Sequence, residues 1–111
     1  MNSDQLHHKW LSGEISRSDV EAWLDYMIEN NCPVRFDTLD VGHVADGIMS
    51  IYNFVTHGHP PGHFVSAVLR NDLVGAALSA DRDNRQALWL YAAFLHHVAP
   101  GNWREWIEGG E

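Results

Sequence analysis

Cysteine, cationic side chains and long apolar runs are scarce in this sequence, and each scarcity removes a class of protein. Cys32 is the single cysteine among 111 residues, so neither a disulfide within the chain nor a cysteine-based zinc site can form. The apolar runs are only a few residues long, which is too short to cross a bilayer. The N-terminal segment lacks the apolar stretch of a secretory signal. We therefore expect a soluble protein of the cytoplasm.

The shortage of cations gives the chain a strongly acidic balance. Seven Lys and Arg stand against fifteen Asp and Glu, for a formal net charge of −8. The cations are scattered and form no basic stripe, so we expect no direct binding of nucleic acid. Residues 1–46 hold nine acidic and three basic side chains, a net charge of −6. This segment should repel phosphate groups and attract a basic protein surface.

Apolar residues, in contrast, are plentiful enough to build a core. They make up 45% of the chain and include five tryptophans. A chain of this length buries roughly 65% of the surface that its unfolded state exposes. Such a composition excludes wholesale disorder and predicts one folded domain over residues 1–111.

The first two predicted helices carry both capping signals and apolar stripes. Residues 4–11 should form a short helix with Ser3 as N-cap and Gly13 at its end. Ser18 and Glu21 have the spacing of a capping box and predict the start of a second helix. Behind them, apolar residues recur at helical spacing on one face: Val20, Trp23, Leu24, Met27 and Ile28.

The rest of the chain is also helical in its pattern. A third helix should begin at Asp37 or Thr38 and stop at Gly58. A fourth follows the Pro60-Pro61 turn and can break at Asn71-Asp72, where a new helix would be capped.

The last predicted helix starts with Asp83 and Gln86 as a second capping box and ends before Pro100. A short turn over residues 102–107 follows. No segment sustains the two-residue alternation of a strand, so we predict an all-α fold, a compact bundle of five or six short helices.

Residues 57–103 contain a series of short motifs. They are His57-Gly58, Pro60-Pro61-Gly62-x-Phe64, Ala67-Val68-Leu69, Asn71-Asp72-Leu73, Ala80-Asp81, Asn84, Leu88, Tyr91, Phe94-Leu95, Ala99-Pro100 and Trp103. Over this part, a little under half of its length, the chain resembles small, mostly uncharacterised proteins encoded by bacteriophages and prophages. The resemblance implies a phage or prophage origin and carries no assigned chemistry. Those proteins tend to have an apolar residue in place of His59 and a small one in place of His63.

Three histidines, His57, His59 and His63, form the pattern most typical of a metal site. Neutral imidazole binds Zn, Ni or Cu, and three of them could form an open site. The competing interpretation is that His57 complements the dipole at the end of a helix while the other two are solvated. We expect no metal and no other cofactor, and keep a small metal- or ligand-binding protein as the alternative function.

Catalytic motifs are missing from the sequence. Cys32 and His43 are the only Cys–His combination worth naming, and only Arg35 lies near enough in sequence to lower the pKa of the thiol. Asp81 and Asp83 are paired carboxylates, but they lie where helix N-caps are expected. No nucleophile elbow, phosphate loop or dinucleotide fingerprint is present. We therefore expect a protein without enzymatic activity.

The second helix carries an acidic stripe that is harder to explain by folding alone. Glu21, Asp25 and Glu29 are spaced four apart and should lie one above another, with Asp19 at the same end as Glu21. The predicted helix contains no Lys or Arg. Early carboxylates favour the helix dipole, but Glu29 is at the end where negative charge is unfavourable. The stripe is thus either a solvated face or the part that docks on a basic partner.

These patterns together predict a non-enzymatic interaction protein, and the resemblance implies that it is encoded by a phage or prophage and acts inside a bacterial host cell. Its partner-binding residues would be Glu21, Asp25 and Glu29, and its partner a host protein with a basic surface, such as a nucleic-acid-handling complex. Inhibition of a bacterial defence system such as CRISPR interference would fit the resemblance and the acidity. A homo-oligomer with a structural role is a third option, and Trp103 and Trp106 could form a contact patch.

Overall fold

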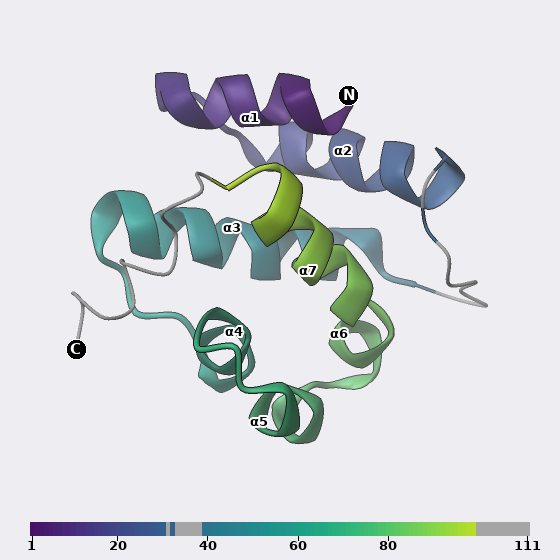
Figure 1. Ribbon diagram of the computed structural model, residues 1–111, viewed down its shortest axis with the longest axis vertical. Coiled ribbons are helices and arrows are strands. Elements are labelled where there is room, and N and C mark those ends of the chain that lie inside the picture. Colours follow the sequence, from purple (N-terminus) through teal and green to yellow (C-terminus); the bar gives the residue numbers. More distant parts are fainter. Residues whose placement is uncertain (31, 33–38, 100–111) are drawn as a thin grey trace.

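Seven α-helices and no strand are found in the part of the chain that the computed structural model describes, residues 1–30, 32 and 39–99 (Figure 1). The prediction of an all-α bundle is confirmed, although these residues alone form more helices than the five or six expected. Within the same residues, none of the helices has both the length and the apolar character needed to span a bilayer.

The first three helices form the upper part of the molecule in Figure 1. α1 (Ser3–Ser12) and α2 (Arg17–Asn30) make an antiparallel pair, and α3 (Val41–His57) runs beneath α2 in the opposite direction. Each of the three turns one apolar stripe inward, as the helical spacing predicts. The buried residues of α2 are Val20, Trp23, Leu24 and Met27.

The last four helices are shorter and fold back toward the first three. α4 (His63–Leu69) and α5 (Leu73–Ser79) pack side by side at the lower end of Figure 1. α6 (Arg82–Gln86) lies against α3, and α7 (Leu88–His97) returns from there to α1. The first and last of the seven helices are therefore neighbours in space.

The aromatic centre of the core lies where α7 meets α1 and α2. The ring of Phe94 is 5.6 Å from that of Trp10 and 5.7 Å from that of Trp23, measured between centroids. Trp10 also meets Tyr52 of α3 edge to face at 5.2 Å. Both tryptophans are buried, as their positions in the stripes predict. α7 is apolar around most of its circumference because other helices cover it on several sides.

The first two helices begin one or two residues earlier than predicted. The N-cap of α1 is Asn2 and not Ser3, and Gln5 completes its capping box. In α2 the cap is Ser16: its hydroxyl accepts the N–H of Asp19 at 3.3 Å, and its own N–H donates to the Asp19 carboxylate at 3.0 Å. The assignment of the box to Ser18 and Glu21 is wrong, because both residues lie inside the helix. Gly13 ends α1 with φ of 75°, as expected.

Aspartates cap three of the later helices. Asp40 accepts the N–H of His43 at 3.1 Å and starts α3, while the predicted caps Asp37 and Thr38 lie outside the described residues. Asp72 accepts the N–H of Gly75 at 2.9 Å, so the predicted break before Leu73 is confirmed.

The cap of α6 is Asp81, which accepts the N–H of Asn84 at 2.9 Å. The prediction of Asp83 and Gln86 as the capping box of one long helix is therefore wrong. The helical path stops at Gln86 and α7 begins at Leu88, with Ala87 as the C-cap of one helix and the N-cap of the next. Gly58 ends α3 with φ of 70°, as predicted.

α3 and α7 cross closely at a glycine. A Cβ atom at Gly47 would overlap the hydroxyl of Tyr91, so only glycine allows this approach. The Tyr91 side chain is fully buried, and its hydroxyl donates to the Asn84 side-chain oxygen at 2.7 Å. Burial raises the pKa of Tyr91 far above its ordinary value, with the charges of Asp81 and Asp46 acting in the same direction. This contact fixes α7 and α6 against α3.

Candidate partner-binding surface

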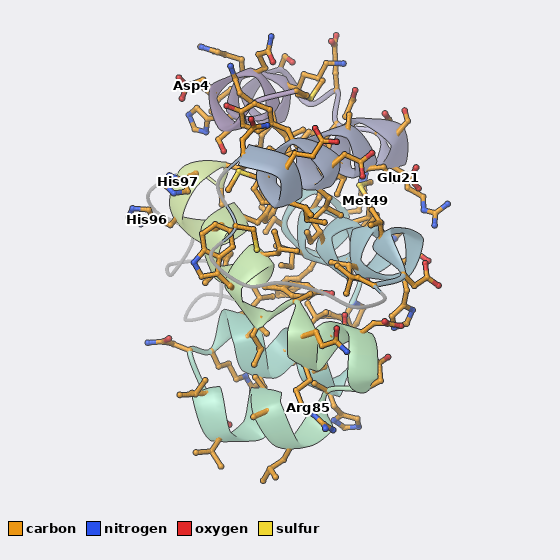
Figure 2. All side chains as sticks on the ribbon, turned by 90° about the vertical axis from the view of Figure 1, so that its right-hand side faces the viewer. Asp4, Glu21, Met49, Arg85, His96 and His97 are labelled. Carbon is orange, nitrogen blue, oxygen red and sulfur yellow. The ribbon has the colours of Figure 1, made fainter. Side chains whose placement is uncertain are left out.

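The acidic residues predicted to bind a partner lie on the outer side of α2. Asp25 and Glu29 are exposed, and Glu21 is half-buried. Figure 2 shows Glu21 at the surface and directed away from the core. The inner side of the same helix holds the buried apolar stripe. The side chains of α2 therefore form one packed face and one acidic face.

A cation within α2 neutralises one end of this stripe. The helix starts at Arg17, so the prediction that it contains no Lys or Arg is wrong. The Arg17 guanidinium lies 3.5 Å from the Glu21 carboxylate and 2.8 Å from that of Asp46 on α3. It also donates to the carbonyl oxygen of Gly42 at 3.0 Å. Glu21 is therefore engaged within the protein, at the edge of the acidic surface.

Asp19 is also occupied by the fold. Its carboxylate accepts hydrogen bonds from Ser16 and from the Lys9 ammonium, which lies 3.1 Å away on α1. Burial alone would raise the pKa of Asp19, but the hydrogen bonds from Ser16 and Lys9, with the Lys9 charge, outweigh it and leave the pKa below its ordinary value. This residue joins α1 to α2 and does not belong to the docking stripe.

The surface that remains is the pair Asp25 and Glu29, which we call the acidic face. No cationic side chain of the described residues forms an ion pair with either carboxylate. The last turn of α2 contains no basic residue, although that is where a cation would stabilise the helix dipole. Of the three predicted residues, Asp25 and Glu29 are thus the two whose negative charge no described cation neutralises.

The histidines of the alternative, metal-binding interpretation are spread along an exposed turn. His57 is the last residue of α3, His59 follows Gly58, and His63 begins α4. The rings of His57 and His59 are 5.7 Å apart between centroids. Within residues 1–30, 32 and 39–99, no three His, Cys, Asp or Glu side chains are arranged to hold a metal ion. The geometry gives this alternative no support.

His43 was the histidine that the sequence analysis paired with Cys32. In the structure its imidazole forms a hydrogen bond with Asp81. The imidazole Nε2 lies 2.6 Å from the Asp81 carboxylate and joins the first turn of α3 to the cap of α6. The hydrogen bond to Asp81 raises the pKa of His43; burial opposes it, and the charges of Asp81, Asp83 and Asp40 reinforce it. The pKa of Asp81 is lowered by the Asn84 N–H and then by His43, against the effect of burial. The His43–Asp81 pair therefore holds α3 and α6 together.

A second surface, which the sequence analysis missed, lies between α4, α5 and α7. It is a groove of about 300 Å³, more apolar than polar, and open to solvent. Beside it, Leu73, Val74 and Leu78 of α5 are 72%, 68% and 81% exposed. The signal in the sequence is that α5 has no charged residue and is apolar on both sides, so a single buried stripe cannot account for it.

Trp103 and Trp106, which the sequence analysis considered as a contact patch, lie outside the described residues.

Comparisons of the chain with protein family models, with characterised proteins and with solved structures found no match. The two surfaces and their charge are therefore the features of the molecule that indicate its function.

Proposed function

We propose that this chain is a non-enzymatic interaction protein that docks its acidic face, Asp25 and Glu29, on a basic surface of a partner protein. The observation that supports this most strongly is the position of the two carboxylates. Both are exposed in the second half of α2, and Glu29 lies in its last turn, where negative charge opposes the helix dipole and no basic residue offsets it. The helix gains no stability from the charge of Glu29 at that place, whereas docking on a basic surface would give it a role.

The net charge of the whole chain also favours binding to a basic partner. A net charge of −8, of which residues 1–46 supply −6, creates a negative field around α1 and α2. Such a field accelerates encounter with a basic partner and orients it before contact. Among the described residues, Lys9 and Arg17 form ion pairs with Asp19 and Asp46, so neither of these two cations neutralises the acidic face.

The class of partner follows from charge and from the phage resemblance. Proteins that handle nucleic acid have basic surfaces that bind phosphate, and an acidic protein can occupy such a surface in place of the nucleic acid. In a phage or prophage setting, a host complex of this kind is the partner we propose, with inhibition of a defence system such as CRISPR interference as the consequence. The resemblance alone supports the phage setting.

A capture experiment tests the proposal with two variants of equal charge. Asp25→Asn with Glu29→Gln removes two negative charges, and Glu14→Lys replaces one negative by one positive, so both raise the net charge by two. Glu14 is exposed in the turn between α1 and α2 and lies outside the acidic face. Immobilised wild type and variants are incubated with bacterial lysate at two salt concentrations, and the captured proteins are quantified.

We expect a basic protein that the wild type captures and the double variant loses, while Glu14→Lys retains most of it. Its association rate should fall with added salt, because exposed charges are screened. An equal loss of capture in the double variant and in Glu14→Lys would show that only the total charge of the protein matters. Loss of capture in neither variant would remove the acidic face from the proposal altogether.

A further inference from the structure

An exposed apolar surface lies at the opposite end of the molecule from α1 and α2. α5 forms part of that end in Figure 1, and no described element covers its outer side. Figure 2 shows side chains made only of carbon projecting outward from the α4–α5 pair. Leu78, the most exposed of them at 81%, contributes little to the core that the described residues form. Contiguous apolar exposure of this kind marks an interaction surface.

Next to these side chains lies the groove that could receive them. Ala67 and Val68 of α4, Ala76 of α5 and Leu95 of α7 line it with carbon, and Leu73 lies at its edge and is itself exposed. Its polar lining comes from Asn71, Asp72 and His96. A self-complementary contact between two copies requires a protruding and a concave surface on each copy, and the α4–α5 end has both.

Charge indicates which partner fits this surface. Residues 63–80, the segment that contains α4 and α5, include Arg70 and Asp72 as their only charged residues and sum to zero, in a chain of net charge −8. Two copies that met through α1 and α2 would bring their negative fields together. At the α4–α5 end they meet without like charges, whereas a basic partner would be drawn to the acidic face instead.

We propose that two copies of this chain associate through the α4–α5 surface. In a two-fold arrangement, the exposed α5 side chains of each copy, Leu73, Val74 and Leu78, enter the groove of the other. The surface is small compared with obligate interfaces, so the dimer should be weak, with a Kd on the order of 10–100 µM.

Sedimentation velocity over a range of about 1 to 500 µM tests the proposal. The wild type should shift from monomer to dimer across this range. Leu78→Asp should raise the Kd at least ~10-fold, because a carboxylate in the apolar groove would be desolvated without a partner. The matched control is Leu11→Asp: Leu11 is 62% exposed on α1, far from the surface, and the same charge is added. Its Kd should stay within ~2-fold of the wild type.

Salt separates this association from docking of the acidic face. Screening of the repulsion between two copies of net charge −8 should leave the dimer unchanged or slightly stronger, and capture of a basic partner should weaken. Asp25→Asn with Glu29→Gln should dimerise like the wild type, so failure of one proposal leaves the other intact. A monomeric wild type throughout the range would overturn the proposal, and so would a rise in Kd with Leu11→Asp equal to that with Leu78→Asp, because the dimer would then not depend on the α4–α5 surface. A monomer that binds an apolar helical peptide through Leu78 would overturn it as well.

Discussion

The two ends of this molecule are built from helix pairs whose outer surfaces differ in polarity. The α1–α2 pair turns most of its apolar residues inward, with Leu11 as an exception, and places charge outside, including Asp25 and Glu29. The α4–α5 pair is nearly free of charge and leaves Leu73 and Leu78 exposed. One end is therefore suited to a partner of opposite charge, and the other to a neutral, apolar surface.

Helix length is one physical reason for the difference. α2 has 14 residues, enough turns to separate a packed stripe from a polar face. α4 and α5 have seven residues each, about two turns, and both are rich in apolar residues. Packing against each other and α7 covers only part of that apolar surface. Short helices of this composition leave an interaction surface unless a further element covers it.

The largest expected effect comes from matched truncations at the two ends. Leu24→Ala in α2 should lower the free energy of unfolding by about 3 kcal/mol, because Leu24 is fully buried and its removal leaves a cavity. Leu78→Ala in α5 should change it by less than about 0.5 kcal/mol, since that side chain is already in water. Urea unfolding at a protein concentration below the Kd proposed for the dimer measures both. Similar losses at the two positions would abolish the contrast between the ends.

A second pair of variants tests the crossing that joins the ends. Gly47→Ala should destabilise the protein by about 1–3 kcal/mol, because the new methyl group meets the buried Tyr91 hydroxyl. Gly42→Ala in the same helix meets only the flexible end of Arg17 and the Asp40 carboxylate. That control should stay within about 1 kcal/mol of the wild type, because the gain in helix propensity offsets the small shift required of Arg17. Thermal unfolding of both variants gives the comparison, and a stabilised Gly47→Ala would contradict the close approach of α3 and α7.

The ion pair between His43 and Asp81 predicts a pH dependence. The pKa of His43 is raised above its ordinary 6.5, so this contribution to stability is fully present below pH 6.5 and is lost as pH rises through the folded-state pKa. The pKa of Asp81 is lowered below 3.8, so its contribution is present above pH 3.8 and is lost as pH falls through the folded-state pKa. The pair therefore stabilises the fold most between these two limits.

His43→Gln measures that contribution. Near pH 5.5 the variant should be less stable than the wild type by no more than about 1 kcal/mol, because both side chains are half-exposed and screened by solvent. The difference should shrink toward zero at alkaline pH, where the wild-type imidazole is neutral. Melting temperatures across the pH range check it. A difference that persists unchanged at pH 9 would show that the loss is one of packing and not of charge.

The smallest effects are expected within the acidic stripe itself. Glu29→Lys should stabilise the monomer by a few tenths of a kcal/mol, since a cation near the end of α2 favours the helix dipole. Glu21→Lys should destabilise it by a similar amount, because it places a cation beside Arg17 and near the start of the helix. Thermal unfolding at low salt measures the opposite signs, and added salt should reduce both. Two changes of the same sign would indicate that the stripe is not polarised along α2.

The sequence predicted those features of the fold that depend on neighbouring residues. Apolar spacing located the helices, and Gly13, Gly58 and Asp72 marked ends and starts correctly. The cap of α2 was misplaced because Ser18 with Glu21 has the same pattern as Ser16 with Asp19. Local pattern does not decide between them; the ion pair of Asp19 with Lys9 on α1 adds a contact that only the folded chain provides.

Features that combine distant segments escaped the sequence analysis. The exposed positions of Asp25 and Glu29 follow from the helical repeat, but the ion pair of Arg17 with Asp46 joins two helices. His43 and Asp81 are 38 residues apart and meet only because α6 lies on α3. The groove likewise takes its lining from three helices. Such sites depend on how helices pack, which their individual periodicity does not specify.

The contacts of α7 with α1 and α2 also determine the order in which the chain can fold. Phe94 meets Trp10 and Trp23, and the imidazole of His7 bonds the carbonyl oxygen of Val98 at 2.6 Å, across 91 residues. During synthesis the first two helices leave the ribosome long before α7, so their tryptophans stay uncovered on one side until α7 arrives. Such distant contacts slow folding because loop closure precedes their formation. Chain elongation, and not the intrinsic stability of α1 and α2, should therefore limit when this core closes in the cell.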